Sequence, residues 1–281
     1  MITVKSFAKL NLSLDLVGKC EDGYHLLRSV MQTVTLCDIL SFRKIKEGIQ
    51  ITCNKPYIPT DERNIVYKIA KAFMDKYSIT SGVHINLCKH IPSGAGLGGG
   101  SSNGAITLNT LCKLFGIEMT TEEKVELTRD IGADIPFFFY GGTALCEGIG
   151  EIVTPTKPLP ECWFVIVKPP RSISTPSIFK SPITANNFGT DSTDKVIAAI
   201  DSENINGVAS NIFNALEPAS IDICPEIEEI KAELVKNGAK AAMMSGSGSA
   251  VFGIFKNHRS AKLAREQFLV KYREVYIAKP V

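Results

Sequence analysis

Residues 91–105 read IPSGAGLGGGSSNGA, and this stretch decides how the rest of the sequence is interpreted. Five of the seven residues at 94–100 are glycine, and the run lies between an alternating segment at 83–88 and a helical pattern at 106–115. Glycines allow sharp turns that bring several backbone N–H groups toward one point, and the N-terminus of the following helix adds its positive dipole end. A flexible turn would explain a single Gly-x-Gly, whereas five glycines followed by two serines predict a phosphate-binding loop.

Two common phosphate loops match this stretch poorly. Gly94, Gly96 and Gly99 satisfy the Gly-x-Gly-x-x-Gly pattern of dinucleotide sites, which also needs an acidic residue about 20 residues further on, at the end of a second strand. Glu118 is the only nearby candidate, and it lies in a turn just before a predicted helix. The Walker pattern fails because Gly100 stands where its lysine belongs. A third type of phosphate loop is therefore needed.

The composition narrows the class of protein. The chain has 281 residues, 44% of them apolar, with 31 Lys and Arg against 29 Asp and Glu. These values exclude disorder and a basic field for nucleic acid, and no apolar run of about 18 residues predicts a membrane span. Eight cysteines occur without a Cys-x-x-Cys pair, which indicates reduced thiols rather than disulfides or a zinc site. We expect a cytoplasmic protein without a nucleic-acid or membrane partner, and without metal except what its ligands bring.

Apolar periodicity on both sides of the loop predicts mixed helices and strands. Residues 9–16 alternate strictly, with four leucines on one face and Lys9, Asn11, Ser13 and Asp15 on the other. Thr120 and Glu123 form a capping-box pattern for a helix that ends near Gly132. Further helices are predicted at 64–77, 106–115, 192–201, 225–236 and 259–272, and strands at 83–88, 241–244, 250–255 and 273–279. The order lacks regular parallel-barrel units and predicts an α+β fold, divided by the proline-rich connection at 154–163 into domains 1–155 and 156–281.

Outside the glycine stretch, four features are candidates for chemistry. A solvated strand face would explain Lys9 and Asn11, and a turn or helix cap would explain Asp134. Phosphoryl transfer, however, requires a carboxylate that positions the acceptor hydroxyl and a cation near the developing charge. The segment DGYH at 22–25 is either a hairpin turn or a Tyr-His pair that contacts a ring. SGSGS at 245–249 is a second small-residue loop, suited to a close backbone approach to a ligand.

The glycine stretch resembles the ATP loop of the GHMP kinase superfamily, named after galactokinase, homoserine, mevalonate and phosphomevalonate kinases. Within that superfamily, the motifs at 8–34, 96–103, 132–139 and 172–179 are similar to those of the 4-diphosphocytidyl-2-C-methyl-D-erythritol kinases, and the resemblance runs from about residue 5 to about residue 256. It implies two α+β lobes with the active site in the cleft between them. It also implies that ATP, bringing Mg²⁺, phosphorylates the 2-hydroxyl of the cytidine-diphosphate-linked methylerythritol in the non-mevalonate route to isoprenoids.

The resemblance also implies roles for individual residues. Asp134 would be the catalytic base and Lys9 its cationic partner, and Asn64 and Lys89 would lie near the adenosine. The residues that would wrap the ATP phosphates are Pro92, Ser93, Gly94, Ala95, Gly96, Leu97, Gly98, Gly99, Gly100, Ser101 and Ser102. The residues that would line the pocket of the second substrate are Asn11, Tyr24, His25, Thr175 and Phe179.

Two departures and two alternatives accompany this hypothesis. Gly104 stands where an alanine is usual. Ala-Met-Met precedes SGSGS, where the family usually has an arginine-containing segment, so the resemblance does not define the geometry of the loop at 245–249. One alternative is a GHMP kinase for another alcohol such as homoserine, which the DGYH segment and the triple glycine disfavour. The other is an inactive nucleotide sensor on the same fold, which would be expected to have lost Lys9 or Asp134. The sequence does not distinguish a monomer from a homodimer.

Overall fold

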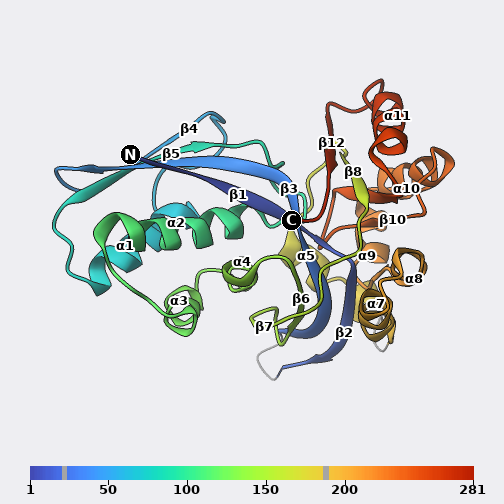
Figure 1. Cartoon of the computed structure of the whole chain (residues 1–281), viewed down its shortest axis with the longest axis horizontal. Coiled ribbons are helices and arrows are strands. Elements are labelled where there is room, and N and C mark those ends of the chain that lie inside the picture. Colours follow the sequence, from blue (N-terminus) through green and yellow to red (C-terminus); the bar gives the residue numbers. More distant parts are fainter. Residues whose placement is uncertain (21–23, 186–189) are drawn as a thin grey trace.

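Figure 1 shows a computed structural model of the chain, which describes residues 1–20, 24–185 and 190–281 in two lobes. The N-terminal part supplies β1 (Ile2–Asn11), β2 (Ser13–Lys19), β3 (His25–Ile45), β4 (Ile49–Cys53), α1 (Ile65–Lys76), β5 (Gly82–Cys88), α2 (Gly99–Phe115), α3 (Thr121–Thr128), α4 (Phe137–Tyr140), β6 (Thr143–Glu147) and β7 (Ile152–Pro155). The rest supplies β8 (Trp163–Lys168), α5 (Thr175–Phe179), α6 (Pro182–Ala185), α7 (Ser192–Asp201), α8 (Ile205–Asn211), β9 (Phe213–Asn214), α9 (Glu217–Ile223), α10 (Glu226–Lys236), β10 (Ala241–Met244), β11 (Val251–Phe255), α11 (His258–Phe268) and β12 (Glu274–Ala278).

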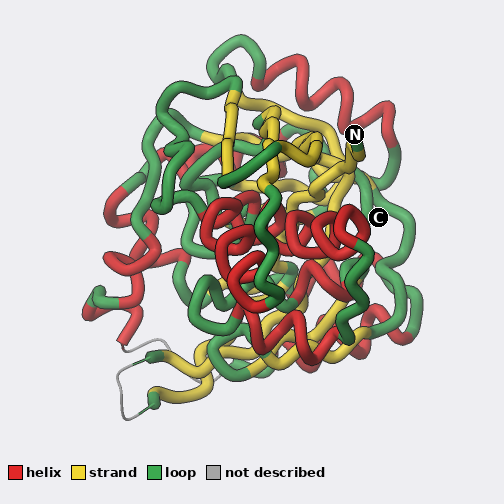
Figure 2. Tube along the Cα trace, turned by 90° about the vertical axis from the view of Figure 1, so that its left-hand side faces the viewer, coloured by secondary structure: helices red, strands yellow, loops and turns green. Residues whose placement is uncertain are grey.

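The long strand β3 is the spine of the larger sheet. It pairs antiparallel with β1, β2, β5 and β6, and β4 extends the sheet beside β5. Helices α1 and α2 lie on one face of this sheet, as Figure 2 shows from the side of the N-terminal lobe. The short strand β9, from the second half of the chain, pairs with β2 and so continues the sheet between the lobes.

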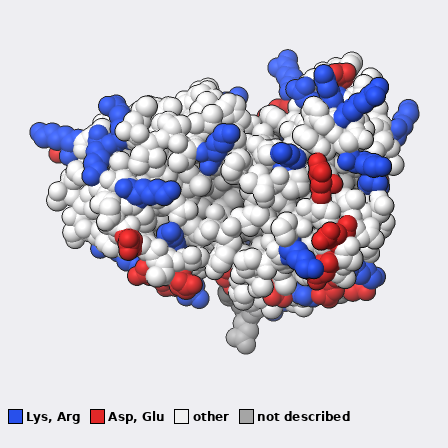
Figure 3. Space-filling model, viewed as in Figure 1, with Lys and Arg blue, Asp and Glu red and all other residues white. Residues whose placement is uncertain are grey.

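The smaller sheet belongs to the second lobe and has the order β10-β11-β8-β12, with every pair antiparallel. Helices α10 and α11 pack against it (Figure 1). The apolar core is continuous across the lobes, because Leu10 of β1 and Leu12, between β1 and β2, join Phe164, Ile166 and Val196 in one buried cluster. Between the lobes, the face drawn in Figure 3 is hollowed and carries few charged side chains.

The first strands differ from their prediction. The chain is interrupted at Leu12, so β1 ends at Asn11 and β2 begins at Ser13. The polar face is not solvated: Lys9, Asn11, Ser13 and Asp15 are all buried. The explanation by a solvated strand face is therefore wrong, because other parts of the chain cover this face. Lys9 lies beside Gly98 and Asp134 of the first lobe, and Ser13 and Asp15 form hydrogen bonds with Thr193 of the second.

Other predictions of secondary structure are confirmed with shifted ends. Helix α1 begins at Ile65, one residue after the predicted start, because Asn64 is its N-cap and its side chain accepts a hydrogen bond from the Val66 amide at 2.9 Å. Helix α2 begins at Gly99 instead of residue 106, because the last glycines of the run already form its first turn. The capping box of Thr120 and Glu123 is present. Helix α11 ends at Phe268, four residues before the predicted end.

Two further findings concern the cysteines and the length of the helices. All eight cysteines are free thiols in the structure. Within residues 1–20, 24–185 and 190–281, no helix combines the length and the apolar character needed to cross a membrane.

Candidate active site

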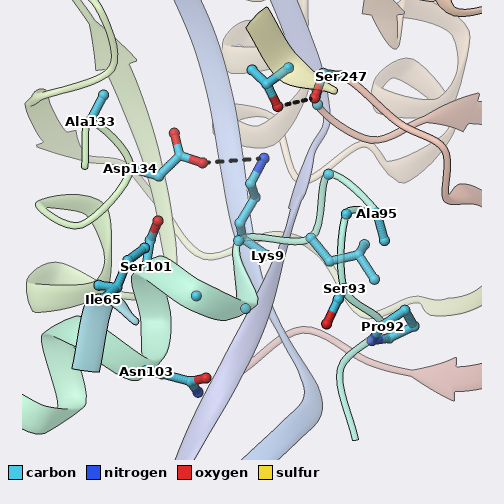
Figure 4. Close-up of a pocket in the computed structure, with 18 of the residues that line it drawn as sticks. Lys9, Ile65, Pro92, Ser93, Ala95, Ser101, Asn103, Ala133, Asp134 and Ser247 are labelled. Carbon is cyan, nitrogen blue, oxygen red and sulfur yellow. Dashed lines mark hydrogen bonds and ion pairs between the residues drawn. The ribbon is translucent and has the colours of Figure 1, made fainter. Parts of the chain in front are cut away.

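A pocket with a volume of about 560 Å³ lies between the glycine loop and the second lobe (Figure 4). Its wall is formed by residues 92–101, which are joined by side chains from β1, α1 and α5 and by the segment before α4. The loop SGSGS at 245–249 contributes Gly246 and Ser247. The glycine stretch and the candidates for phosphoryl transfer, which are far apart in the sequence, therefore face one cavity.

The glycine loop follows β5 and runs directly into α2. Ala95 and Leu97 are buried and fix the loop to the core, while Gly94, Gly96 and Gly98 have φ values of 60°, 73° and 65°. Only glycine adopts that left-handed backbone at little cost. The first residues of α2, Gly99 to Ser101, line the pocket, so the positive end of the helix dipole faces it next to the turns of the glycine loop. This arrangement is suited to binding a phosphate.

Lys9 and Asp134 form an ion pair at the side of this loop. The Lys9 Nζ atom lies 3.9 Å from Asp134 Oδ2, as the dashed line in Figure 4 shows. The Lys9 side chain is only 3% exposed, whereas Asp134 is 35% exposed and open to the pocket. Burial lowers the pKa of Lys9 below its usual value, and the negative charge of Asp134 opposes part of that shift. The pair thus combines a buried cation with a carboxylate that a ligand can reach.

Hydrogen bonds from β1 and β3 orient Lys9. The Lys9 ammonium donates to Asn11 Oδ1, and the amide of Asn11 donates to Ser29 Oγ at 2.8 Å. The backbone N–H of Lys9 donates to the Leu97 carbonyl at 3.0 Å, which joins β1 to the glycine loop. The position of the cation is therefore coupled to the position of the loop.

The residues predicted for the second substrate do not all reach the pocket. Thr175 and Phe179, on α5, line it, and Thr175 shares a 2.7 Å hydrogen bond with Ser247. His25 is buried with its ring centroid 5.5 Å from that of Phe179, and burial lowers its pKa below the usual value. Tyr24 is 62% exposed. Neither Tyr24 nor His25 is among the described residues that line the pocket, and Asp22 and Gly23 of the same segment lie outside the described residues.

Three residues predicted for the nucleotide side have partners within the protein. The Ser102 hydroxyl is buried against Ser6 Oγ at 2.7 Å, and its N–H donates to the Gly98 carbonyl, so neither group is available to a phosphate. Asn64 lines the pocket, but its side chain caps α1. Lys89 also lines the pocket, and its ammonium contacts the carboxylate of Asp38.

Asp38 and Asn103 were missed by sequence reasoning. Asp38 is the one charged residue in the apolar stretch TVTLCDILSF at 33–42. A charge inside such a stretch indicates a buried carboxylate, which needs a partner. Asn103 lines the pocket and donates to Asp38 Oδ2 at 2.9 Å. Asn103 follows the two serines in the first turns of α2, and the sequence alone did not show which way it faces.

Comparison with known proteins identifies the family to which the chain is similar. Residues 64–142 match the model for the GHMP kinases N terminal domain, and residues 196–273 match the model for the GHMP kinases C terminal. A protein of Clostridium botulinum (strain Eklund 17B / Type B) named 4-diphosphocytidyl-2-C-methyl-D-erythritol kinase is 44% identical over 280 residues, which is 100% of both chains. A protein of Clostridium novyi (strain NT) with the same name is 44% identical over 99% of both chains.

Solved structures agree with the sequence matches. A crystal structure of 4-(cytidine 5'-diphospho)-2C-methyl-D-erythritol kinase superposes with a TM-score of 0.86 at 30% identity, covering 99% of this chain and 98% of that one. Homoserine kinase from Cytophaga hutchinsonii has a TM-score of 0.78 at 18% identity, covering 99% of this chain and 95% of that one. The second likeness shows a common fold, in keeping with the predicted two-lobed α+β architecture.

Proposed function

The chain belongs to the GHMP kinase superfamily and, within it, to the 4-diphosphocytidyl-2-C-methyl-D-erythritol kinases, and on that premise we propose which of its residues perform the reaction. It is an ATP-using kinase that phosphorylates 4-diphosphocytidyl-2-C-methyl-D-erythritol in the methylerythritol phosphate route to isoprenoids. The acceptor in our proposal is the 2-hydroxyl. The observation that carries the assignment is the ion pair of Lys9 and Asp134, 3.9 Å apart beside the glycine loop.

Asp134 acts on the acceptor and Lys9 on the developing charge. The acceptor oxygen attacks the γ-phosphorus, the bond from that phosphorus to the β,γ-bridging oxygen breaks, and ADP leaves with the bond electrons. The proton of the acceptor hydroxyl passes to the Asp134 carboxylate, which the pocket leaves accessible. The Lys9 ammonium, held by Asn11, stabilises the negative charge that develops as the phosphoryl group moves.

The two substrates occupy opposite sides of this pair. On one side, backbone N–H groups of residues 93–101 and the N-terminus of α2 bind the ATP phosphates, with the adenosine toward Asn64. On the other side, Thr175 and Phe179 bind the cytidine part of the acceptor, and His25 supports the Phe179 ring. Tyr24 joins them through its exposed ring when the substrate is bound.

Mg²⁺ enters this proposal as a companion of ATP. The described residues contain no group of three or more His, Cys, Asp or Glu side chains that could hold a metal ion. The pocket does offer the Asp134 carboxylate and the Ser101 hydroxyl, both oxygen ligands of the kind Mg²⁺ prefers alongside substrate phosphates and water. These residues fit an ion held mainly by the nucleotide, which would neutralise phosphate charge.

We also propose a division into domains 1–155 and 156–281 and a cytoplasmic location. The first is supported by the connection after β7, which leads from the larger sheet into the smaller one. The second is supported by eight free thiols, which a reducing compartment preserves.

An ADP-release assay tests the reaction against both alternatives. The purified protein is given ATP and Mg²⁺ with the cytidine substrate, with homoserine, or with no acceptor, and the product is identified by phosphorus NMR. We expect rapid ADP release with the cytidine substrate alone and a new phosphomonoester on its 2-hydroxyl. Turnover of homoserine would favour a kinase for a simpler alcohol. ATP binding without ADP release for any acceptor would favour an inactive sensor.

A further inference from the structure

Both oxygens of the Asp38 carboxylate accept hydrogen bonds from residues at the ends of the glycine loop, although Asp38 is not among the described residues that line the pocket. Its side chain is fully buried. Oδ1 accepts from the backbone N–H groups of His90 at 2.7 Å and Ile91 at 2.8 Å. Oδ2 accepts from the ammonium of Lys89 and from the amide of Asn103 at 2.9 Å. A buried carboxylate is tolerated only with such partners, and here both oxygens are occupied.

The donors lie on both ends of the phosphate loop. Lys89, His90 and Ile91 lead from β5 into the loop, whereas Asn103 is on α2, after the loop has ended. The carboxylate of Asp38 therefore holds the segment before the loop and the helix after it together, and residues 92–98 connect the two. Since β3 also pairs with β1 and β5, the carboxylate is attached to the rigid centre of the larger sheet.

Two further contacts strengthen this attachment. Lys89 Nζ donates to Asn103 Oδ1 at 3.2 Å, so the lysine and the asparagine hold each other as well as Asp38. Asn103 Nδ2 also donates to Ser6 Oγ on β1 at 2.9 Å. The ammonium of Lys89 lies under the first turn of α2, because a Cβ at Gly99 would be 3.1 Å from it. The charge of Asp38 thus keeps this cation beneath the loop.

We propose that Asp38 is a positioning residue for nucleotide binding, which sets the distance between the two ends of the phosphate loop through Lys89, Asn103 and the amides of His90 and Ile91. The proposal rests on the proposed function, in which this loop binds the ATP phosphates. It changes the role expected for Lys89: its ammonium supports the loop from below and is not free to bind adenosine. Backbone donors are effective only when they are held in place before the ligand arrives, so loss of this carboxylate weakens nucleotide binding.

The test compares Asp38→Asn with the matched control Asp15→Asn. In Asp38→Asn the new amide faces the ammonium of Lys89 and the amide of Asn103, so donors oppose donors. Asp15 is also a buried carboxylate, but its hydrogen-bond partners among the described residues are Thr190 and the Thr193 amide at 2.8 Å, so it holds the start of α7 and not the phosphate loop. Thermal denaturation, calorimetric titration with a non-hydrolysable ATP analogue, and separate KM values for ATP and for the cytidine substrate are measured for each.

We expect both variants to melt at lower temperature, but only Asp38→Asn to raise the Kd and the KM for nucleotide, by ten-fold or more, with the KM of the cytidine substrate little changed. If folded Asp38→Asn binds the analogue within two-fold of the wild type, the proposal is wrong. If Asp38→Asn does not fold, Ser6→Ala replaces it: removal of the Ser6 contact to Asn103 should raise the Kd several-fold, and an unchanged Kd overturns the proposal. Failure of the wild type to bind the analogue would instead refute the proposed function.

Discussion

The hydroxyl of Ser245 donates a hydrogen bond to the carbonyl oxygen of Gly96 at 3.1 Å, and this contact joins the two lobes at the phosphate loop. The same hydroxyl accepts from the backbone N–H of Asn11 at 3.3 Å. Beside it, the Ala250 amide donates to the Ala95 carbonyl at 3.2 Å. The second lobe therefore supports the glycine loop directly, and the shape of the loop depends on a segment about 150 residues away in the sequence.

Replacing Gly96 with alanine should push the glycine loop away from the loop at 245–249. A Cβ at this position would lie 1.9 Å from the Ser245 carbonyl oxygen, a distance that backbone atoms cannot accommodate without moving, and φ is 73°. We expect Gly96→Ala to lower nucleotide affinity at least ten-fold and to lower the melting temperature. Titration calorimetry with an ATP analogue and thermal denaturation measure the two effects.

Gly48→Ala is the control for backbone strain alone. Gly48 has a nearly identical φ of 75°, but a Cβ there would meet nothing within 4 Å. We expect the free energy of unfolding of the Gly48→Ala protein to fall by about 1 kcal/mol, because a residue with a side chain is strained in the left-handed region. Its nucleotide affinity should be unchanged. Equal nucleotide affinities in Gly96→Ala and Gly48→Ala would show that the contact with Ser245 does not shape the loop.

Asp134→Asn should impair turnover and spare nucleotide binding. The amide keeps the shape of the side chain but cannot take the proton of the acceptor, a role that typically contributes about 10²–10⁴-fold to the rate. We expect kcat to fall by about that factor with little change in the Kd for ATP. Asp130→Asn, an exposed position on the same segment, serves as the control and should retain full activity. Near-normal turnover by Asp134→Asn would exclude Asp134 as the base.

The rate should also depend on the charge of Lys9 at alkaline pH. Burial lowers the pKa of Lys9 from its usual value of 10.5, so the ammonium loses its proton at a lower pH than an exposed lysine does. Since the charged form stabilises the developing negative charge, kcat/KM should decrease as pH rises toward and past this lowered pKa. A pH–rate profile, limited to the range in which the melting temperature is constant, records the alkaline limb.

Lys9→Arg identifies the group responsible for this limb. A guanidinium stays protonated throughout the range, so the alkaline decrease should disappear even though its different shape lowers the maximal rate. If the limb persisted unchanged in Lys9→Arg, another group would be responsible for it.

Local patterns made part of this site predictable. The glycine loop is a continuous segment with strong turn chemistry, and Lys9 and Asp134 lie in short motifs that the family resemblance identified. The ion pair of Asp38 with Lys89 was not predicted, because its partners are 51 residues apart and nothing in the spacing shows that they meet. The contact of Ser245 with Gly96 was hidden for the same reason.

The start of α2 and the burial of β1 are two other features that the sequence patterns did not predict correctly. Helix propensity disfavours glycine, so the pattern placed the start of α2 after the run, whereas tertiary contacts stabilise the helix from Gly99 onward. An alternating strand is usually solvated on its polar side. Here Ser13 shares a 2.8 Å hydrogen bond with Thr193, and the Asn11 amide donates to Ser29 Oγ at 2.8 Å, so partners from elsewhere in the chain satisfy the buried polar groups.

Phe179→Ala should weaken binding of the cytidine substrate without affecting ATP. Phe179 lines the pocket beside Thr175, and the ring of His25 packs against it with the ring centroids 5.5 Å apart. Stacking of a base on an aromatic ring is worth about 1–3 kcal/mol in nucleic-acid complexes, which corresponds to a KM increase of roughly ten- to a hundred-fold. Tyr140→Ala, which removes an exposed aromatic side chain outside the pocket, should leave both KM values unchanged.

The uridine analogue of the acceptor distinguishes stacking from reading of the ring edge. Uracil offers the same two faces to Phe179, but it replaces the exocyclic donor of cytosine with an acceptor. If a polar group of the protein reads that edge, the analogue leaves it unpaired in a closed site and adds a penalty comparable to the stacking energy. We therefore expect kcat/KM for the uridine analogue to fall further than Phe179→Ala lowers it for the cytidine substrate. Equal kcat/KM values for the two acceptors would show that the ring edge is not read, and would favour recognition of the diphosphate and the methylerythritol part alone.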